Sequence, residues 1–260
     1  MTELTPPVAL PVQDALELLE RGEITVQGRI TTASNATLYC GVELDGIAAA
    51  CVYKPVSGER PLWDFPDGTL AEREVASYLV AAATGWDLVP PTVLREGPLG
   101  TGMVQLWIAH DDSFDIIAAI NAGQLTGLQR MALLDAVVNN SDRKVSHLLP
   151  VAGALPGSAG DGAGQSGPHV YGVDHGVSFA VENKLRTVLW QWAGDPIPAE
   201  GIDMLQRLSG LLDGDLAEQL SALLTTMEVR ATRKRVRRLL AKGSFPMPSP
   251  NWPAVPYPPY

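Results

Sequence analysis

Cysteine is scarce in this chain of 260 residues, which contains only Cys40 and Cys51. Neither belongs to a CxxC pair, and no group of cysteines and histidines has the spacing of a zinc site. These absences exclude a disulfide scaffold and argue against a structural zinc. We therefore predict that Cys40 and Cys51 are ordinary buried thiols.

Long apolar runs are also absent, since none reaches the roughly 20 residues that span a bilayer as a helix. The first residues, MTELTPPVALPVQD, contain an acidic residue, early prolines and no basic stretch, unlike a secretory signal peptide. With 46% hydrophobic and 18% charged residues, the composition is that of a globular protein with a sizeable core. We expect a cytoplasmic protein without a transmembrane segment.

Basic residues are outnumbered, with 19 Lys and Arg against 29 Asp and Glu, and the net charge is -10. Seven basic residues and no acidic residue follow Val229, namely Arg230, Arg233, Lys234, Arg235, Arg237, Arg238 and Lys242. Binding of a polyanion there would oppose the field of the acidic body. We therefore expect a solvated or intramolecularly paired helix face, with Val229, Val236 and Leu240 turned inward, and no nucleic-acid partner.

The first part of the chain has the pattern of a small sheet. Residues 15–22 have helical spacing and end on a glycine, and three strand-like segments follow: ITVQGRI, LYCGVEL and AAACVYKPV. Turn chemistry joins the segments, including Asp45-Gly46, which predicts an antiparallel meander. TLAEREVASYLVAAATG then predicts a helix with Thr69 as its N-cap and Gly85 at its end. VPPTVLREG and GMVQLWIAH read as two further strands, so residues 1–108 form a β-rich lobe.

Residues 109–260 are mainly helical in pattern. A Gly, Ala, Ser and Pro-rich insert at 153–168 interrupts them, and we expect it to be weakly ordered. A Pro-rich and aromatic tail at 244–260 is read as an extended strap packed on the body, or as a polyproline ligand for a protein partner. A β-rich lobe followed by a helical lobe predicts an α+β, two-lobed protein kinase-like fold.

Four ionisable residues occur in the order that phosphoryl transfer in this fold requires. Lys54 lies at the end of the third strand and Glu74 lies on the next helix. Paired with Glu74, the Lys54 ammonium would be held against the nucleotide phosphates. Asp142 lies in the polar stretch NNSDRKVSH after a helix, and Asp174 lies in YGVDHGVSF. Each residue alone has an ordinary surface explanation. Their order on the expected elements favours a kinase in which Asp142 serves the acceptor hydroxyl.

Two further segments are candidates for contacts with ATP. The loop TTASNAT, with Ser34 and Asn35, offers backbone N-H groups and a hydroxyl to phosphate, although it lacks glycine. The connection between the lobes follows Gln105, Leu106, Trp107 and Ile108, whose backbone would meet adenine.

These segments resemble the phosphoinositide 3-/4-kinase-like branch of the protein kinase superfamily, and within it an actinobacterial group. The residues that carry the resemblance are SNAT, VYKPVSGERPLWDFPDGTLAEREVASYL, VPPTVLREGPLGTGMVQLWI, NNSDRKVSH, GVDHGVSF and FPMPSPNWPAVPYPPY. The resemblance implies that NNSDRKVSH is the catalytic loop, with Asp142 at the position of its catalytic aspartate. It also implies that VDHG takes the place of the metal motif, with Asp174 as a ligand of Mg²⁺ or Mn²⁺.

The sequence departs from this family at His147, where the loop usually has an asparagine that holds a second metal. Either His147 ligates a metal directly, which would favour Mn²⁺ and make activity fall below about pH 6.5, or it hydrogen-bonds a phosphate or Asp174. The accessory domains of lipid kinases are absent, so a protein or small-molecule acceptor is favoured over a lipid. A pseudokinase or nucleotide-binding regulatory module, and an adaptor that uses the tail, are the alternatives.

Overall fold

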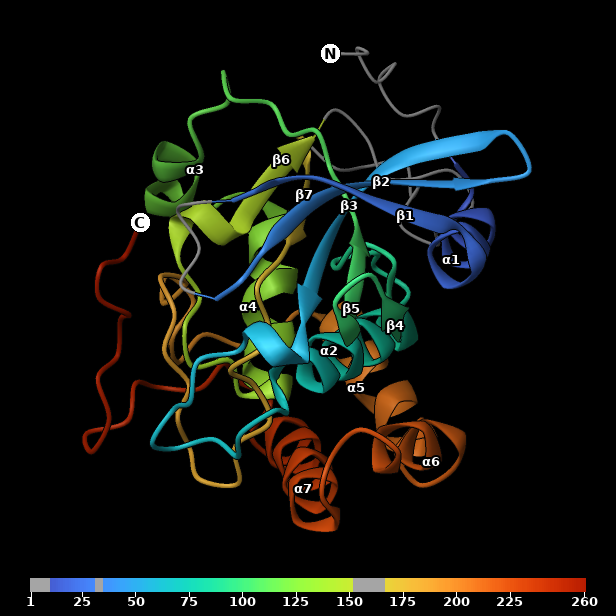
Figure 1. Cartoon of the computed structure of the whole chain (residues 1–260). Coiled ribbons are helices and arrows are strands. Elements are labelled where there is room, and N and C mark those ends of the chain that lie inside the picture. The colour runs from blue at the N-terminus through green and yellow to red at the C-terminus, as the bar shows by residue number, and fades with distance from the viewer. Residues whose placement is uncertain (1–9, 31–34, 152–166) are drawn as a thin grey trace.

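The computed structural model describes residues 10–30, 35–151 and 167–260. The chain has the predicted α+β, two-lobed kinase-like architecture, with a β-rich lobe and a helical lobe (Figure 1). The loop position Ser34 and the predicted insert up to residue 166 lie outside the described residues.

The β-rich lobe contains a five-stranded antiparallel sheet with the strand order β1-β2-β3-β5-β4. Its strands are β1 (Glu23–Arg29), β2 (Leu38–Leu44), β3 (Ile47–Pro55), β4 (Thr92–Gly97) and β5 (Gly100–Leu106). Asp45 and Gly46 both have positive φ, 50° and 83°, and form the tight turn predicted between β2 and β3. Cys40 and Cys51 face each other across these two strands and are buried free thiols, as predicted.

Two helices pack on this sheet. Helix α1 (Val12–Arg21) contacts β2, β4 and β5, and α2 (Leu70–Thr84) contacts β4 and β5. Thr69 is the N-cap residue of α2, as predicted, but its hydroxyl donates to the Pro66 carbonyl and makes no capping bond to the helix. The carboxylate of Glu59, from the preceding loop, accepts the N-H groups of Leu70 and Ala71. A residue distant from the helix therefore satisfies its first donors.

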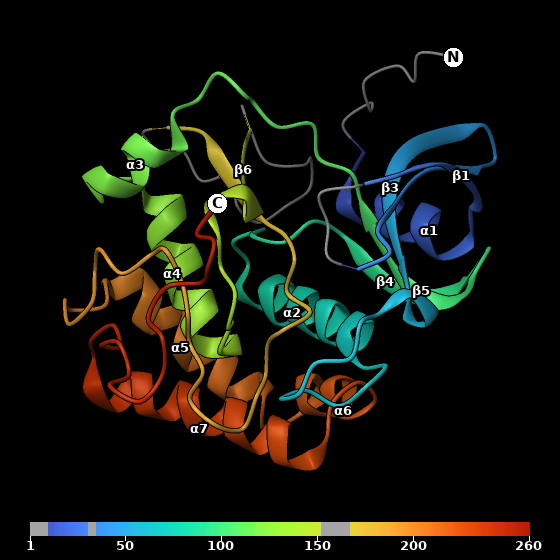
Figure 2. The ribbon, with the colours of Figure 1, turned by 60° about the vertical axis from the view of Figure 1, so that its left-hand side comes forward.

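The second lobe consists of helices packed around a β-hairpin. Its elements are α3 (Ile116–Ala122), α4 (Thr126–Val138), a 3-10 turn η2 (Val145–His147), β6 (Leu148–Val151), β7 (His169–Gly172), α5 (Ala199–Leu211), α6 (Asp215–Ser221) and α7 (Thr226–Lys242). Figure 2 shows α2 lying over α4, α5 and α7. Apolar residues of all four helices form one buried cluster, so α2 joins the two lobes through a common core.

The basic face of α7 is paired within the chain, as predicted. Arg235 donates to the carbonyl oxygens of Val137 at 2.9 Å and Ala180 at 3.1 Å, and Arg237 pairs with Asp213 at 3.1 Å. Val229 and Val236 face the core, but Leu239 is buried where Leu240 was expected, and Leu240 is only partly buried. In the part of the chain that the structure describes, no helix has the length and apolarity to cross a membrane.

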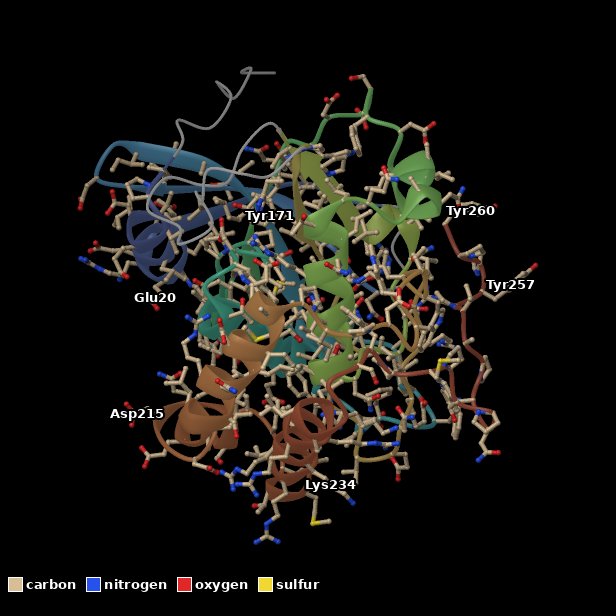
Figure 3. The ribbon with its side chains drawn as sticks, turned by 180° about the vertical axis from the view of Figure 1, so that it is seen from behind. Glu20, Tyr171, Asp215, Lys234, Tyr257 and Tyr260 are labelled. Atoms are coloured by element: carbon tan, nitrogen blue, oxygen red, sulfur yellow. The ribbon has the colours of Figure 1, made fainter. Side chains whose placement is uncertain are left out.

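The C-terminal tail packs along the body, as predicted. The carbonyl oxygen of Ala254 accepts hydrogen bonds from Thr187 N at 3.0 Å and Trp190 Nε1 at 2.8 Å. The carbonyl of Pro259 accepts the N-H of Val145 at 2.9 Å. In Figure 3 the side chains of Tyr257 and Tyr260 point away from the body, while the backbone beside them is held by these bonds.

Candidate active site

The four ionisable residues predicted from the sequence line one cavity. Lys54 reaches it from the end of β3, Glu74 from α2, Asp142 from the loop after α4 and Asp174 from the loop after β7. The cavity has a volume of about 410 Å³, which lies within the range of small-molecule sites. Residues separated by up to 120 positions in the sequence are therefore brought to one place.

Lys54 lies at the centre of the ion pairs. Its Nζ lies 2.6 Å from Glu74 Oε1, which is the expected pair, and 2.9 Å from Asp174 Oδ1, which the sequence did not predict. Burial lowers the pKa of Lys54, but the charges of Asp174 and Glu74 outweigh burial and hold this pKa above its ordinary value. The ammonium is therefore charged at any physiological pH.

Glu74 connects α2 to the segment that follows β7. Its side chain is 2% exposed, and its second oxygen accepts the N-H of His175 at 2.7 Å. Burial raises the pKa of Glu74, and the charge of Lys54 opposes this shift. Arg73, the preceding residue, adds two contacts to the second lobe: 2.5 Å to Glu228 and 2.7 Å to the Ser178 carbonyl. Helix α2 is thus held with Glu74 turned toward the cavity.

The polar stretch Asn139–His147 is accommodated mainly by buried structural contacts. Arg143 is fully buried and pairs with the equally buried Asp135 of α4 at 2.9 Å. It also donates to the Val173 carbonyl at 2.9 Å and lies 2.6 Å from His175 Nε2. Arg143 therefore ties α4, the polar loop and the Asp174 segment together. Sequence reasoning treated Arg143 as part of a motif and missed this role.

Asp142 lies at the cavity with two cations close to it. Lys144 Nζ is 3.2 Å from Asp142 Oδ2, and Arg186 Nη2 is 3.8 Å from Asp142 Oδ1. Burial raises the pKa of Asp142, and the charge of Lys144 partly offsets this effect. The sequence analysis missed both cations. Lys144 was visible two residues after Asp142, but only the fold brings Arg186 to the same carboxylate.

His147 contacts Asp174, which lines the cavity, but His147 is not itself among the lining residues. His147 Nε2 lies 3.3 Å from Asp174 Oδ2, and the Lys54 charge holds the pKa of Asp174 well below its usual range. Asp174 is therefore ionised, and the His147 ring lies against its carboxylate. Burial lowers the pKa of His147 to about 4. Without a bound metal this imidazole is therefore neutral at pH 6.5, whereas the expected fall of activity below that pH was argued for a His147 that ligates a metal.

The described residues contain no group of three or more His, Cys, Asp or Glu side chains placed to hold a metal. Mg²⁺ bound with nucleotide phosphates needs only one or two protein carboxylates, so this finding does not conflict with the donors present. The side chain of Asp174 is 51% exposed at the cavity, and its two oxygens contact only Lys54 and His147 among described residues. This donor set fits a divalent cation shared with phosphate oxygens.

Of the two segments predicted to contact ATP, the phosphate loop reaches the cavity and the interlobe segment does not. Asn35, in the loop, lines the cavity and accepts the N-H of Arg60 at 3.0 Å. The buried Gln105 side chain donates to Thr92 Oγ1 at 2.9 Å, away from any ligand. The N-H groups of Leu106 and Trp107 already donate to Pro91 and Ala50. Of these four interlobe residues none lines the cavity, and Leu106 and Trp107 lack a free N-H for adenine.

A search against protein-family models found no match. Protein Rv2133c of Mycobacterium tuberculosis (strain ATCC 25618 / H37Rv) is 41% identical over 280 aligned residues, which cover 94% of this chain and 95% of that protein. The chain belongs to the family of Protein Rv2133c. Membership at this identity and coverage means that the two proteins share a fold throughout.

Solved structures similar to the chain include kinases. A structure of the Golgi casein kinase with Mn and ADP bound has a TM-score of 0.57 at 12% identity, over 89% of this chain and 75% of that one. The Helicobacter pylori proinflammatory kinase CtkA has a TM-score of 0.50 at 11% identity, over 85% of this chain and 97% of that one. At these identities the likeness establishes the kinase-like fold of the family.

Proposed function

We propose that the protein is an ATP-dependent phosphotransferase that acts on an alcohol group. The observation that carries this proposal is the Lys54 ammonium, held between Glu74 and Asp174 in the cavity that Asp142 also lines. A cation is thus fixed by two carboxylates in a cavity that a third carboxylate lines. In a kinase-like fold it matches what phosphoryl transfer requires.

Each residue of the site then has a distinct task. Lys54 orients the nucleotide phosphates, and Glu74 keeps its ammonium in place. Burial raises the pKa of Asp142, which makes it a better proton acceptor. Asp142 takes the proton of the acceptor's hydroxyl group while the hydroxyl oxygen bonds to the γ-phosphorus of ATP and the bond between that phosphorus and ADP breaks. Lys144, at 3.2 Å from Asp142, places positive charge where the transferred phosphoryl group carries negative charge. Asn35 and Ser34 remain our proposal for the phosphate loop, and Ile108 for the adenine contact.

Asp174, with His147 as its neighbour, is the proposed holder of Mg²⁺ or Mn²⁺. A bound divalent cation would neutralise charge between the phosphates. The Golgi casein kinase structure with Mn and ADP supports a role for such an ion in this fold. Within the fold, we propose the phosphoinositide 3-/4-kinase-like branch, which the segments NNSDRKVSH and GVDHGVSF support.

One observation favours a pseudokinase instead: both oxygens of Asp174 already have partners, Lys54 and His147. Nucleotide binding and phosphate transfer, measured separately with Mg²⁺ and with Mn²⁺, distinguish the two functions. We expect binding and transfer in wild type, and binding without transfer in Asp142→Asn. Binding without transfer in wild type would establish the pseudokinase, and no binding with either ion would contradict both.

A further inference from the structure

The cavity continues beyond the four ionisable residues toward the C-terminal tail. There it is lined by Trp63 and Asp64 of the loop before α2, by Arg186 and by Trp252 of the tail. This region lies next to Asp142, on the side where an acceptor hydroxyl must approach. Its charges therefore bear on the chemical class of the acceptor.

The carboxylates in this part of the cavity already have partners within the chain. Asp64 pairs with Lys184 at 3.0 Å, and the Lys184 ammonium also lies 5.3 Å from the ring centroids of Trp63 and Trp252. Glu59 accepts two N-H groups at the start of α2. Neither carboxylate is left to bind a cationic acceptor, and the Lys184 charge is taken up by Asp64 and the rings.

Arg186, in contrast, keeps free donors. Its Nε donates to the Ser141 carbonyl at 2.5 Å, and its guanidinium stacks 5.8 Å from the Trp252 ring centroid. These contacts fix the guanidinium plane beside Asp142, while its other N-H groups make no hydrogen bond to any described residue. Within the described residues, the buried Trp252 Nε1-H also lacks an acceptor. A buried donor without a partner costs free energy that a ligand oxygen recovers.

We propose that the acceptor is a small hydroxylated molecule that carries a carboxylate or phosphate group, which Arg186 and Trp252 bind. This inference rests on the proposed kinase function and extends it to the substrate class. The anionic group pairs with the Arg186 guanidinium in its fixed plane. Since Arg186 Nη2 lies 3.8 Å from Asp142 Oδ1, the hydroxyl that Asp142 serves lies close to the anionic group within the acceptor.

The tail favours a small molecule over a peptide. It accepts hydrogen bonds from Val145, three residues after Asp142, and from Thr187, the neighbour of Arg186, so it runs along the segments that carry Asp142 and Arg186. An extended peptide would need this surface to bring a hydroxyl to Asp142. A compact acceptor, in contrast, fits the cavity of about 410 Å³ together with the nucleotide's phosphates.

The test separates acceptors by size and charge. A bacterial extract is filtered into macromolecular and small-molecule fractions, and the small-molecule fraction is divided on an anion-exchange resin into neutral and anionic pools. Each fraction is incubated with the full chain and γ-phosphate-labelled ATP. We expect labelled product from the anionic pool. Label from the neutral pool or only in macromolecules overturns the inference but leaves the kinase intact, whereas nucleotide binding without label in any fraction overturns the kinase itself.

Variants then test the residues. Arg186→Gln should raise the KM for the anionic pool's acceptor roughly 10-fold to 100-fold, the effect of losing one hydrogen-bonded charge. Trp252→Phe, which keeps an aromatic ring and removes the N-H, should raise it less. Both variants should keep their affinity for ATP within about twofold of wild type. The control Arg237→Gln on α7 should change neither the affinity for ATP nor the acceptor KM. An unchanged KM in Arg186→Gln contradicts the assignment of the anion to this residue.

Discussion

At the scale of single residues, Lys54 pairs with two carboxylates of the site, those of Glu74 and Asp174. From the sequence alone, Lys54→Met is predicted to leave the fold intact, because a lysine at the end of a strand adds little to a core. The structure changes this expectation, since Glu74 is 2% exposed and would lose its cation. Removing one partner of a buried pair costs free energy because the other charge stays buried.

We predict that Lys54→Met abolishes phosphate transfer and lowers the free energy of unfolding by about 1–3 kcal/mol near neutral pH. Burial already raises the pKa of Glu74, and loss of Lys54 raises it further. An acid whose folded pKa is raised destabilises the fold as pH rises above its unfolded pKa, so the loss should shrink near pH 5. Urea unfolding at both pH values measures it. Lys54→Met/Glu74→Gln is the control and should recover most of the stability without activity.

His147 gives a second prediction at this scale, for the protein without metal or nucleotide. Its folded pKa is about 4, below the unfolded value of about 6.5. Its contribution to stability is therefore present above pH 6.5 and lost as pH falls toward 4, by about 2–3 kcal/mol in total. His147→Asn should be less acid-sensitive than wild type by this amount in urea unfolding. Parallel pH curves for the two proteins would show that His147 is not the buried, neutral group described.

The residues that sequence reasoning found and missed differ in a physical way. Lys54, Glu74, Asp142 and Asp174 were recognisable because their chemistry and order are required by one reaction. Asp135 looked like any helix residue, since the sequence does not show that it is buried against Arg143. The same applies to Arg186, whose relation to Asp142 exists only after two distant segments pack together.

At the scale of elements, α2 decides whether Glu74 reaches Lys54. The sequence predicted the helix from its apolar spacing and its end from Gly85, which has the left-handed φ of 70°. It did not predict the cap from Glu59 or the anchor from Arg73 to Glu228, because both partners lie outside the helix. Local patterns determine that α2 forms, and tertiary contacts determine its orientation.

We predict that Arg73→Ala lowers the free energy of unfolding by about 3–5 kcal/mol, because it leaves Glu228 partly buried without its cation. Hydrogen exchange in α2 should accelerate, and phosphate transfer should fall because Glu74 is held less firmly. The matched control is Arg237→Ala, which removes a pair whose arginine is 59% exposed and should cost less than about 1 kcal/mol. Equal effects of the two variants would contradict the anchoring role of Arg73.

At the scale of the whole molecule, the tail completes the wall of the cavity that the two lobes share. The sequence left two readings for it, a strap or a polyproline ligand for a partner. The carbonyl oxygens of Ala254 and Pro259 accept hydrogen bonds from the body, and Trp252 stacks on Arg186, so the described tail is engaged within the chain. The sequence does not distinguish the strap from the polyproline ligand, because an extended Pro-rich segment has no internal hydrogen bonds and the same composition suits both.

We predict that a chain ending at Ser249 keeps its fold and its ATP affinity but loses acceptor binding. The main core lies in α2, α4, α5 and α7. Removal of residues 250–260 should therefore lower the free energy of unfolding by about 1 kcal/mol, which corresponds to a fall of a few degrees in the melting temperature. Lys54, Glu74, Asp142 and Asp174 remain, which preserves the nucleotide site. Trp252 is lost and Arg186 loses its stacking partner, so the acceptor KM should rise. A truncated chain with unchanged acceptor KM would show that the tail is only an external strap.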